Sequence, residues 1–249
     1  MGTQTTRSSD AVEFTHSWYR EFLDRIREAG YEPRRFCDPP EAGDLLLRHD
    51  VDLSLSAAVE MARIEADRGV SSTYFVLLTS ALYNPLDGAQ RERIRELASL
   101  GHEVALHFST HEYWPADDPP DEADLRRRID DERAALATVV DDPTASISFH
   151  VPPGWVLGRS FDGLTSAYAP EHFRTVDYVA DSGQRWRDAP PDLSALAETA
   201  QVLTHPGLWG ETDRCFSECV ERSVVEACDH GERSAHEEFL DGRDDEGGR

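Results

Sequence analysis

The stretch Leu45-Leu46-Leu47-Arg48-His49-Asp50-Val51-Asp52 joins an apolar run to two aspartates, and the fold of the chain is best worked out from it. The apolar run predicts a buried strand. Side chains two residues apart on a strand point the same way, so we expect the carboxylates of Asp50 and Asp52 to lie together. A second predicted strand, over residues 103–107, leads into His107-Phe108-Ser109-Thr110-His111. His107 and His111 can converge on one ion if the chain turns helically there, which predicts a metal site with a spare carboxylate.

Strand-like and helix-like segments alternate along the rest of the chain. Apolar and β-branched runs predict strands over 44–49, 72–78, 103–107, 145–150, 176–180 and 201–204. Amphipathic spacing predicts helices over 14–29, 55–68, 94–100 and 125–140. This alternation demands parallel strands joined by right-handed crossovers, which a (β/α) barrel or an open doubly wound sheet would satisfy.

Polar residues at the carboxyl ends of the predicted strands favour the barrel, because those ends ring one mouth where active sites lie. The strand-end residues are Asp50, Asp52, His107, His150, Asp181 and His205. The sequence shows no internal repeat and no second domain. We expect one domain over residues 1–229 and a polar, disordered tail over residues 230–249.

The composition of the chain argues against nucleic acid and membranes as binding partners. The formal net charge is −24, and all 25 basic residues are arginine. An acidic surface without lysine is typical of a salt-adapted source, where salt screens self-repulsion. Without a basic face, nucleic acid is not expected as a partner. No apolar run of secretory or membrane-spanning length occurs, so we expect a cytoplasmic protein that binds no membrane.

Five short motifs follow one another across residues 44–209. They are Asp50 with Asp52, His107 with His111, His150-Val151-Pro152-Pro153, Asp181 to Trp186, and Leu203-Thr204-His205. In this order they resemble the motifs of the polysaccharide deacetylases of the NodB-homology type, carbohydrate esterase family four. The resemblance implies an incomplete or distorted barrel of about seven parallel strands and metal-dependent removal of acetyl groups from N-acetylated sugars. The Arg-His-Asp-Val-Asp start resembles a divergent intracellular branch linked with surface-polysaccharide biosynthesis.

The chain also departs from the pattern of that family. Its first motif is Asp-Val-Asp where the family has adjacent aspartates, and Phe108 stands where serine or threonine is usual. The third-motif arginine, which orients the catalytic aspartate in the family, is replaced by His150. One extra residue precedes Trp186, and the second carboxylate usual in that motif is missing. His150 therefore competes with His111 as the third metal ligand.

The chemistry of the candidate residues suggests a role for each. Asp52, His107 and His111 supply the three ligands of a catalytic metal site that keeps one position open. Zinc is the expected ion, with iron, cobalt or nickel as substitutes. Asp50 is the candidate general base and His205 the candidate acid. Asp181 is expected to hold the tautomer of His205. Substrate contacts are assigned to His150, Trp155, Trp186 and Trp209, the tryptophans by stacking on a sugar ring.

These residues predict a metal-dependent hydrolase that removes an acetyl or other acyl group from an N- or O-acetylated sugar or glycan precursor. A hydrolase of another amide bond, or a non-catalytic carbohydrate-binding member of the same fold, is the alternative. The missing arginine favours the binder, whereas the intact aspartate and histidine set argues against it. A simpler interpretation is that Asp50 and Asp52 only cap the following helix and pair with Arg48.

Overall fold

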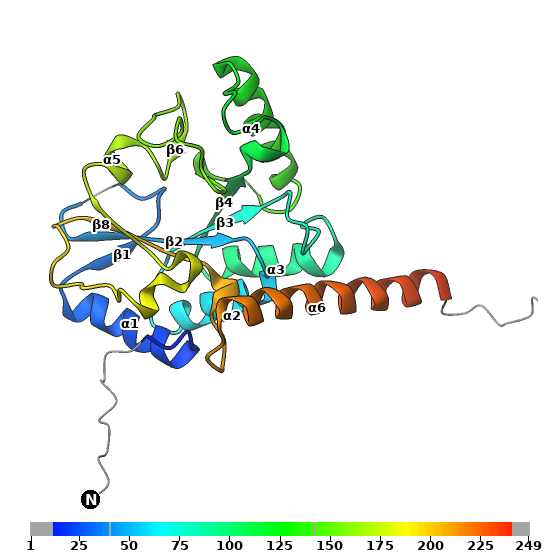
Figure 1. Ribbon diagram of the computed structural model, residues 1–249, viewed down its shortest axis with the longest axis horizontal. Helices are drawn as coiled ribbons and strands as arrows, with labels where there is room; N and C mark the ends of the chain where they lie inside the picture. Colours follow the sequence, from blue (N-terminus) through cyan, green and yellow to red (C-terminus); the bar gives the residue numbers. More distant parts are fainter. Residues whose placement is uncertain (1–11, 40, 142, 241–249) are drawn as a thin grey trace, which may run out of the picture.

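The computed structural model describes residues 12–39, 41–141 and 143–240 (Figure 1). Parallel strands alternate with helices along most of this part of the chain, as the sequence predicts. The helices are α1 (His16–Glu28), α2 (Leu55–Ala66), α3 (Gly88–Ser99), α4 (Glu122–Leu136), α5 (Pro170–Phe173) and α6 (Phe216–Ala235), with short turns η1 (Thr110–Glu112), η2 (Ser182–Arg187), η3 (Pro206–Leu208) and η4 (His236–Leu240). The strands are β1 (Glu32–Arg34), β2 (Asp44–Val51), β3 (Thr73–Leu77), β4 (Glu103–Phe108), β5 (Ser146–Phe149), β6 (Thr165–Ser166), β7 (Asp177–Ala180) and β8 (Ala200–Thr204).

One parallel sheet forms the centre of the molecule. Its strands lie in the order β6-β5-β4-β3-β2-β8-β7, and β1 pairs with the start of β2. Within the described residues β6 and β7 do not pair with each other, so the curled sheet does not close. The fold is therefore an incomplete (β/α) barrel of seven principal parallel strands, which confirms the predicted fold class.

The central strand β2 is buried along its whole length, as its apolar start predicts. Its register with its neighbours aligns the strand ends that carry polar residues. Asp50 pairs with Phe75 on β3, and His49 pairs with Thr204 on β8. His107 on β4 lies beside Ser148 on β5. The predicted candidate residues thus meet at one mouth of the half-barrel.

The helices cover the sheet at the positions that the sequence predicts, and local chemistry explains where they begin and end. Ser54 caps α2, with its hydroxyl accepting a hydrogen bond from the Ala57 backbone N–H at 3.2 Å. Gly30 and Gly101, which follow α1 and α3, have φ angles of 90° and 94°. This left-handed conformation suits glycine and ends a helix.

The far end of the described chain differs from the sequence prediction. α6 runs across the predicted boundary at residue 229, and η4 continues it to Leu240 (Figure 1). The first part of the predicted tail is therefore helical, because a polar stretch can form a helix that faces solvent. Residues 241–249 of that tail lie outside the described residues. β1, β6, α5 and α6 had not been predicted. None of the described helices combines the length and the hydrophobicity needed to cross a membrane.

Candidate metal centre

Three side chains from three strand ends converge at the mouth of the half-barrel. Asp52 follows β2, His107 lies near the end of β4, and His150 follows β5. One potential ligand atom from each lies within 4.8 Å of the others. Among the described residues, this is the one such group of histidine, cysteine and acidic side chains.

The distances within this group fit a small divalent ion. Asp52 Oδ1 lies 3.1 Å from His107 Nε2 and 3.3 Å from His150 Nδ1. A tetrahedral zinc site with bonds of about 2.0–2.1 Å has ligand atoms about 3.3 Å apart. Asp52 Oδ1 is buried, yet it accepts no well-formed hydrogen bond from the described part of the chain. An orphaned carboxylate oxygen between two imidazole nitrogens is the arrangement that a metal ion would satisfy.

The charge state of Asp52 suits the same role. Burial alone would raise the pKa of Asp52, but its contacts with His107 and His150 outweigh burial and hold the pKa well below its usual range. The carboxylate is therefore ionised at neutral pH, as a metal ligand must be.

His111 does not join this group, so the ligand set predicted from His107 and His111 is not assembled. Its side chain is exposed, and Nε2 lies 2.8 Å from the carbonyl oxygen of Val151. β4 continues to Phe108, and η1 is a single 3₁₀ turn. The strand and the tight turn do not place residues four apart on one face, as an α-helix would. His150, the alternative third ligand, takes the place of His111 beside Asp52 and His107.

The backbone after His150 is strained. Val151 has a φ angle of 42°, a conformation that β-branched residues rarely adopt. The backbone N–H of His150 donates to the Phe108 carbonyl at 2.9 Å, which ties the start of this loop to β4. Strain of this kind clusters at functional sites. Here it occurs where the chain turns away from the sheet and His150 reaches the group.

Asp50 lies beside the group, held by an arginine that the sequence analysis did not assign to the site. Arg48, two residues earlier on β2, donates from Nε to Asp50 Oδ1 at 2.8 Å and from Nη2 to Oδ2 at 2.7 Å. Both side chains are buried. Arg48 also donates to Gln201, Tyr168 and Ser148, so its own position is fixed. The strand period of two was the signal in the sequence, because it places residues 48 and 50 on the same face.

The ion pair with Arg48 keeps Asp50 ionised. Burial would raise the pKa of Asp50, but the charge of Arg48, followed by that of His107, outweighs it and lowers the pKa. Asp50 Oδ2 lies 3.6 Å from His107 Nε2. It is therefore at the edge of the candidate metal group, by which we mean Asp52, His107 and His150. Asp50 is therefore an ionised, oriented carboxylate next to the position that an ion would occupy.

His205 approaches from the other side, after β8. Its Nδ1 donates to Asp181 Oδ1 at 2.5 Å, and its Nε2 lies 3.9 Å from Asp52 Oδ2. Asp181 is fully buried and also accepts from the indole N–H of Trp209 at 2.9 Å. Burial alone would lower the pKa of His205, but the charge and hydrogen bond of Asp181 outweigh it and raise the pKa to about 9. His205 is thus held as a proton donor.

Two of the three tryptophans that the sequence assigned to substrate contact are covered by protein. Trp186 and Trp209 are 1% exposed and belong to the core beneath the sheet, where their ring centroids lie 6.0 Å apart. Trp155 is half-buried and packs against the other main core cluster. Trp186 and Trp209 therefore cannot stack on a sugar, because their faces are covered by protein. Spacing along the chain indicated that they were near strand ends but not which way they point.

Two cavities meet at the metal group. One of about 380 Å³ contains Asp50, Asp52, His107, His150 and His205. A second, of about 300 Å³, shares Asp52 and His150 with the first and extends towards η1 and the loop after β3. The group thus lies at the junction of two spaces large enough for parts of an organic substrate.

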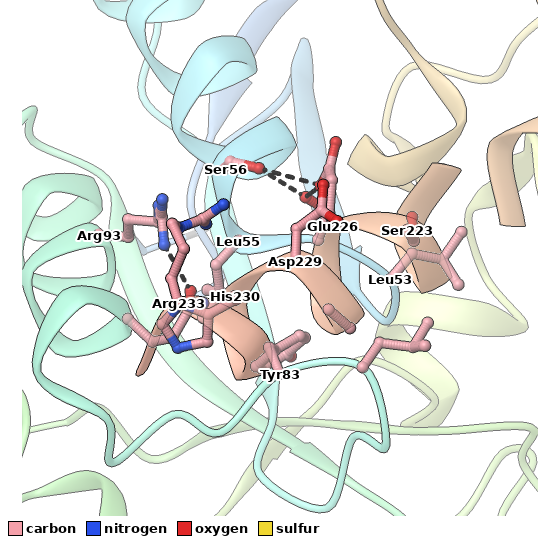
Figure 2. Close-up of a pocket in the computed structure, with 14 residues that line it drawn as sticks. Leu53, Leu55, Ser56, Tyr83, Arg93, Ser223, Glu226, Asp229, His230 and Arg233 are labelled. Carbon is pink, nitrogen blue, oxygen red and sulfur yellow. Dashed lines mark hydrogen bonds between the residues drawn. The ribbon is translucent and has the colours of Figure 1, made fainter. Parts of the chain in front are cut away.

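A further cavity, of about 170 Å³, lies between the start of α2 and α6 (Figure 2). Glu226 accepts hydrogen bonds there from Ser54 and Ser56, and His230 lies 3.4 Å from Asp87. None of the residues predicted for the site lines it. None of the described side chains that line it has a buried polar atom without a hydrogen-bond partner, so it does not present the unsatisfied polar atoms of the metal group.

The fold and the site together define a parallel half-barrel with an Asp-His-His group at its mouth. No family model matches the sequence, and no curated protein is significantly similar to it. Solved structures do share its arrangement. A chitin deacetylase from the fungal pathogen Colletotrichum lindemuthianum is 15% identical, with 80% of this chain and 85% of that chain covered and a TM-score of 0.45.

Two other similar structures are bacterial. A family 4 acetyl xylan esterase from Clostridium thermocellum, in complex with a cobalt ion, is 14% identical, with 76% of this chain and 83% of that chain covered and a TM-score of 0.41. A CE4 family pseudoenzyme from Bacillus anthracis is 16% identical, with 78% of this chain and 63% of that chain covered and a TM-score of 0.44. At such low identity and TM-scores, the chemistry has to be judged from the residues of this chain.

Proposed function

We propose that this protein is a metal-dependent hydrolase that removes an acyl group from an N- or O-acylated sugar or glycan precursor. The observation that carries the proposal is the unsatisfied Asp52 oxygen between two histidine nitrogens, with a separate ionised carboxylate and a separate proton donor beside it. A structural ion pair would not need three distinct groups around one open position. Hydrolysis of an amide or ester needs the ion-binding group, the ionised carboxylate and the proton donor together.

Asp52, His107 and His150 would hold the ion, and their two nitrogens and one oxygen are ligands that suit zinc, cobalt, nickel or iron. The ion would supply polarisation of the acyl carbonyl and acidification of the attacking water. The rest of the chemistry belongs to the side chains around it.

Asp50 takes the proton of the attacking water. Its two-point contact with Arg48 fixes the direction of its lone pairs, and its lowered pKa keeps it ionised at neutral pH. Arg48 thereby does the work expected of the arginine that is missing from the third motif. That absence was the main sequence feature in favour of a non-catalytic protein.

His205 donates a proton to the leaving nitrogen or oxygen. Its raised pKa keeps it protonated at neutral pH, and its contact with Asp181 leaves Nε2 free to face the site.

The test is acetate release from N-acetylated and O-acetylated sugars by the full-length protein, first stripped of metal and then reloaded with zinc, cobalt, nickel or iron. We expect activity to require the ion. Asp52→Asn should lose both metal and activity, whereas the matched isosteric Asp50→Asn should keep the metal and lower kcat by about 10²–10⁴-fold. Sugar binding without turnover, or a protein that binds no ion in excess metal, would contradict the proposal.

A further inference from the structure

The two cavities that meet at the metal group differ in chemistry, and we propose that they divide the substrate between them. The larger cavity takes an apolar acyl chain of about four to eight carbons, longer than acetyl, and the smaller cavity takes the polar sugar part of the substrate. This inference rests on the proposed function and specifies its substrate class.

The walls of the larger cavity are apolar beyond the catalytic groups. Leu157, Phe173, Tyr178 and Leu203 line it, from four separate segments of the chain. The rings of Phe173 and Tyr178 pack with their centroids 5.2 Å apart, which gives the cavity a continuous aromatic side. Tyr168 also lines it, and the hydroxyl of Tyr168 lies 2.8 Å from Arg48 Nη2, so this polar end is already satisfied. Apart from Ser182 and the hydroxyl of Tyr178, the side chains of this wall offer no group that would select a polar substituent.

Size argues for more than an acetyl group. A cavity of about 150 Å³ suffices to bind benzene in an engineered protein core. The present cavity is about 380 Å³, and the carbonyl group to be cleaved would fill only the part of that volume beside the metal group. Trp186, which the sequence assigned to substrate contact, packs in the core and does not line this cavity. An acetyl methyl would leave most of the apolar wall uncovered.

The smaller cavity is suited to the polar part of the substrate. Thr79, Ser80, Ser109 and Glu112 line it beside the shared Asp52 and His150. The Thr79 hydroxyl oxygen is buried and has no hydrogen-bond partner within the described ranges. Leu53, Leu77, Ala81 and Leu82 line the rest of this cavity, and the Ser80 hydroxyl already donates to the Asp52 carbonyl. The hydroxyl of Thr79 and the carboxylate of Glu112 are therefore the groups that can pair with the hydroxyls of a sugar. The carbonyl to be cleaved then lies between the two spaces, next to the metal group.

The test compares N-acyl glucosamines that share one leaving amine and carry acetyl, butanoyl, hexanoyl or octanoyl chains. Each buried methylene is worth about fourfold, so kcat/KM of the zinc-loaded protein should rise at least tenfold from acetyl to hexanoyl even if the chain is only partly buried. A flat series, or one that falls with chain length, overturns the inference.

A matched pair of variants locates the effect. Leu157→Trp adds bulk to the wall of the larger cavity and should lower the hexanoyl-to-acetyl ratio at least about fivefold. Ala81→Trp adds an indole to the smaller cavity and should change both substrates by a similar factor, leaving that ratio within about twofold. If Ala81→Trp lowers the ratio and Leu157→Trp does not, the acyl chain does not lie in the apolar cavity, and the inference is wrong.

Binding to metal-free protein separates this inference from the proposed function. Titration calorimetry with the acetyl and hexanoyl substrates should show at least about tenfold tighter binding of hexanoyl. Such a preference without turnover of any chain length would support the acyl cavity and contradict the hydrolase. Equal turnover and equal binding of all chain lengths would support the hydrolase and overturn the acyl cavity.

Discussion

Two polar clusters lie on opposite faces of the same strand, β2, and they differ in how completely their hydrogen bonds are satisfied. Arg48 and Asp50 point to the face that bears the metal group. His49, between them, points to the other face, where it meets Glu65 of α2. The clusters share a strand, although Asp52 and His150 are partly exposed whereas His49 and Glu65 are fully buried.

The Glu65 cluster is complete. Glu65 Oε1 accepts hydrogen bonds from His49 Nε2, at 2.7 Å, and from the hydroxyl of Tyr19. Its Oε2 accepts from Ser72 at 2.7 Å and from Tyr74 at 3.0 Å. None of these side chains is left without a partner. The cluster joins α1, α2, β2 and β3, so its hydrogen bonds link these four elements inside the core.

The metal group is incomplete by the same measure. Asp52 Oδ1 and His107 Nδ1 are buried atoms with no well-formed hydrogen bond from the described residues. Buried polar atoms are normally paired, so unpaired ones need a reason. The comparison teaches that the two clusters differ in unmet hydrogen-bonding capacity, which is present at Asp52 and His107 and absent from the Glu65 cluster.

The largest effect that we expect concerns the third metal ligand. His150→Ala should weaken zinc binding by more than about a hundredfold, the upper range for losing even an outer-sphere partner. His111→Ala should leave about one ion per chain, since its imidazole contacts a backbone carbonyl instead. Elemental analysis and competition with a chelator measure both. Loss of metal from His111→Ala alone would restore the ligand set first predicted from the sequence.

The next largest effect concerns the free energy of unfolding, which should differ between a variant in the Glu65 cluster and one in the metal group. Glu65→Ala removes the acceptor of four buried donors and should lower the free energy of unfolding by about 3–5 kcal/mol. Asp52→Ala, in metal-free protein, should lower it by less than about 1 kcal/mol, because functional groups are commonly held at a cost to stability. Chemical denaturation of both variants decides the matter. Equal losses would mean that the two clusters are both structural.

The smallest effect is the pH dependence of stability in metal-free protein. The pKa of His205 is raised to about 9, so its stabilising contribution is complete below the unfolded pKa of about 6.5 and is lost as pH rises through 9. Burial would raise the pKa of Glu65, but His49 and the hydrogen bonds around it lower the pKa to about 2. That contribution is complete above about pH 4.5 and is lost as pH falls towards 2.

The two clusters should therefore weaken at opposite ends of the pH scale, each by about 1–3 kcal/mol. Asp181→Asn should flatten the alkaline decline, and Glu65→Gln should flatten the acid one. Denaturation curves of the variants and wild type from pH 3 to pH 10 provide the comparison. An unchanged alkaline decline in Asp181→Asn would show that His205 does not depend on Asp181.

Much of the architecture could be predicted because it depends on local pattern. The apolar run before Asp50 could only be a buried strand, and Ser54 and Gly30 mark helix ends through their own chemistry. Some elements escaped prediction, for different reasons. β6 has two residues, too few for a period to show, and α6 has a largely exposed polar surface.

The site was predictable to the level of the strand end. Asp50, Asp52, His107 and His150 meet because parallel strands end at one edge, whatever their side chains. The direction of the chain after each strand was not predictable. It depends on the η1 turn that carries His111 away and on the strained backbone at Val151 beside His150.

The sequence by itself determined the alternation of parallel strands and helices and the strand ends at which the candidate residues gather, because hydrophobic period and strand-end position are local properties. Only the tertiary structure decided that His150 rather than His111 lies with Asp52 and His107, that Arg48 orients Asp50, and that Trp186 packs in the core. Each of these depends on which of several possible neighbours a side chain meets once the loops have closed. Such contacts join residues far apart in the chain, and no pattern within one segment specifies them.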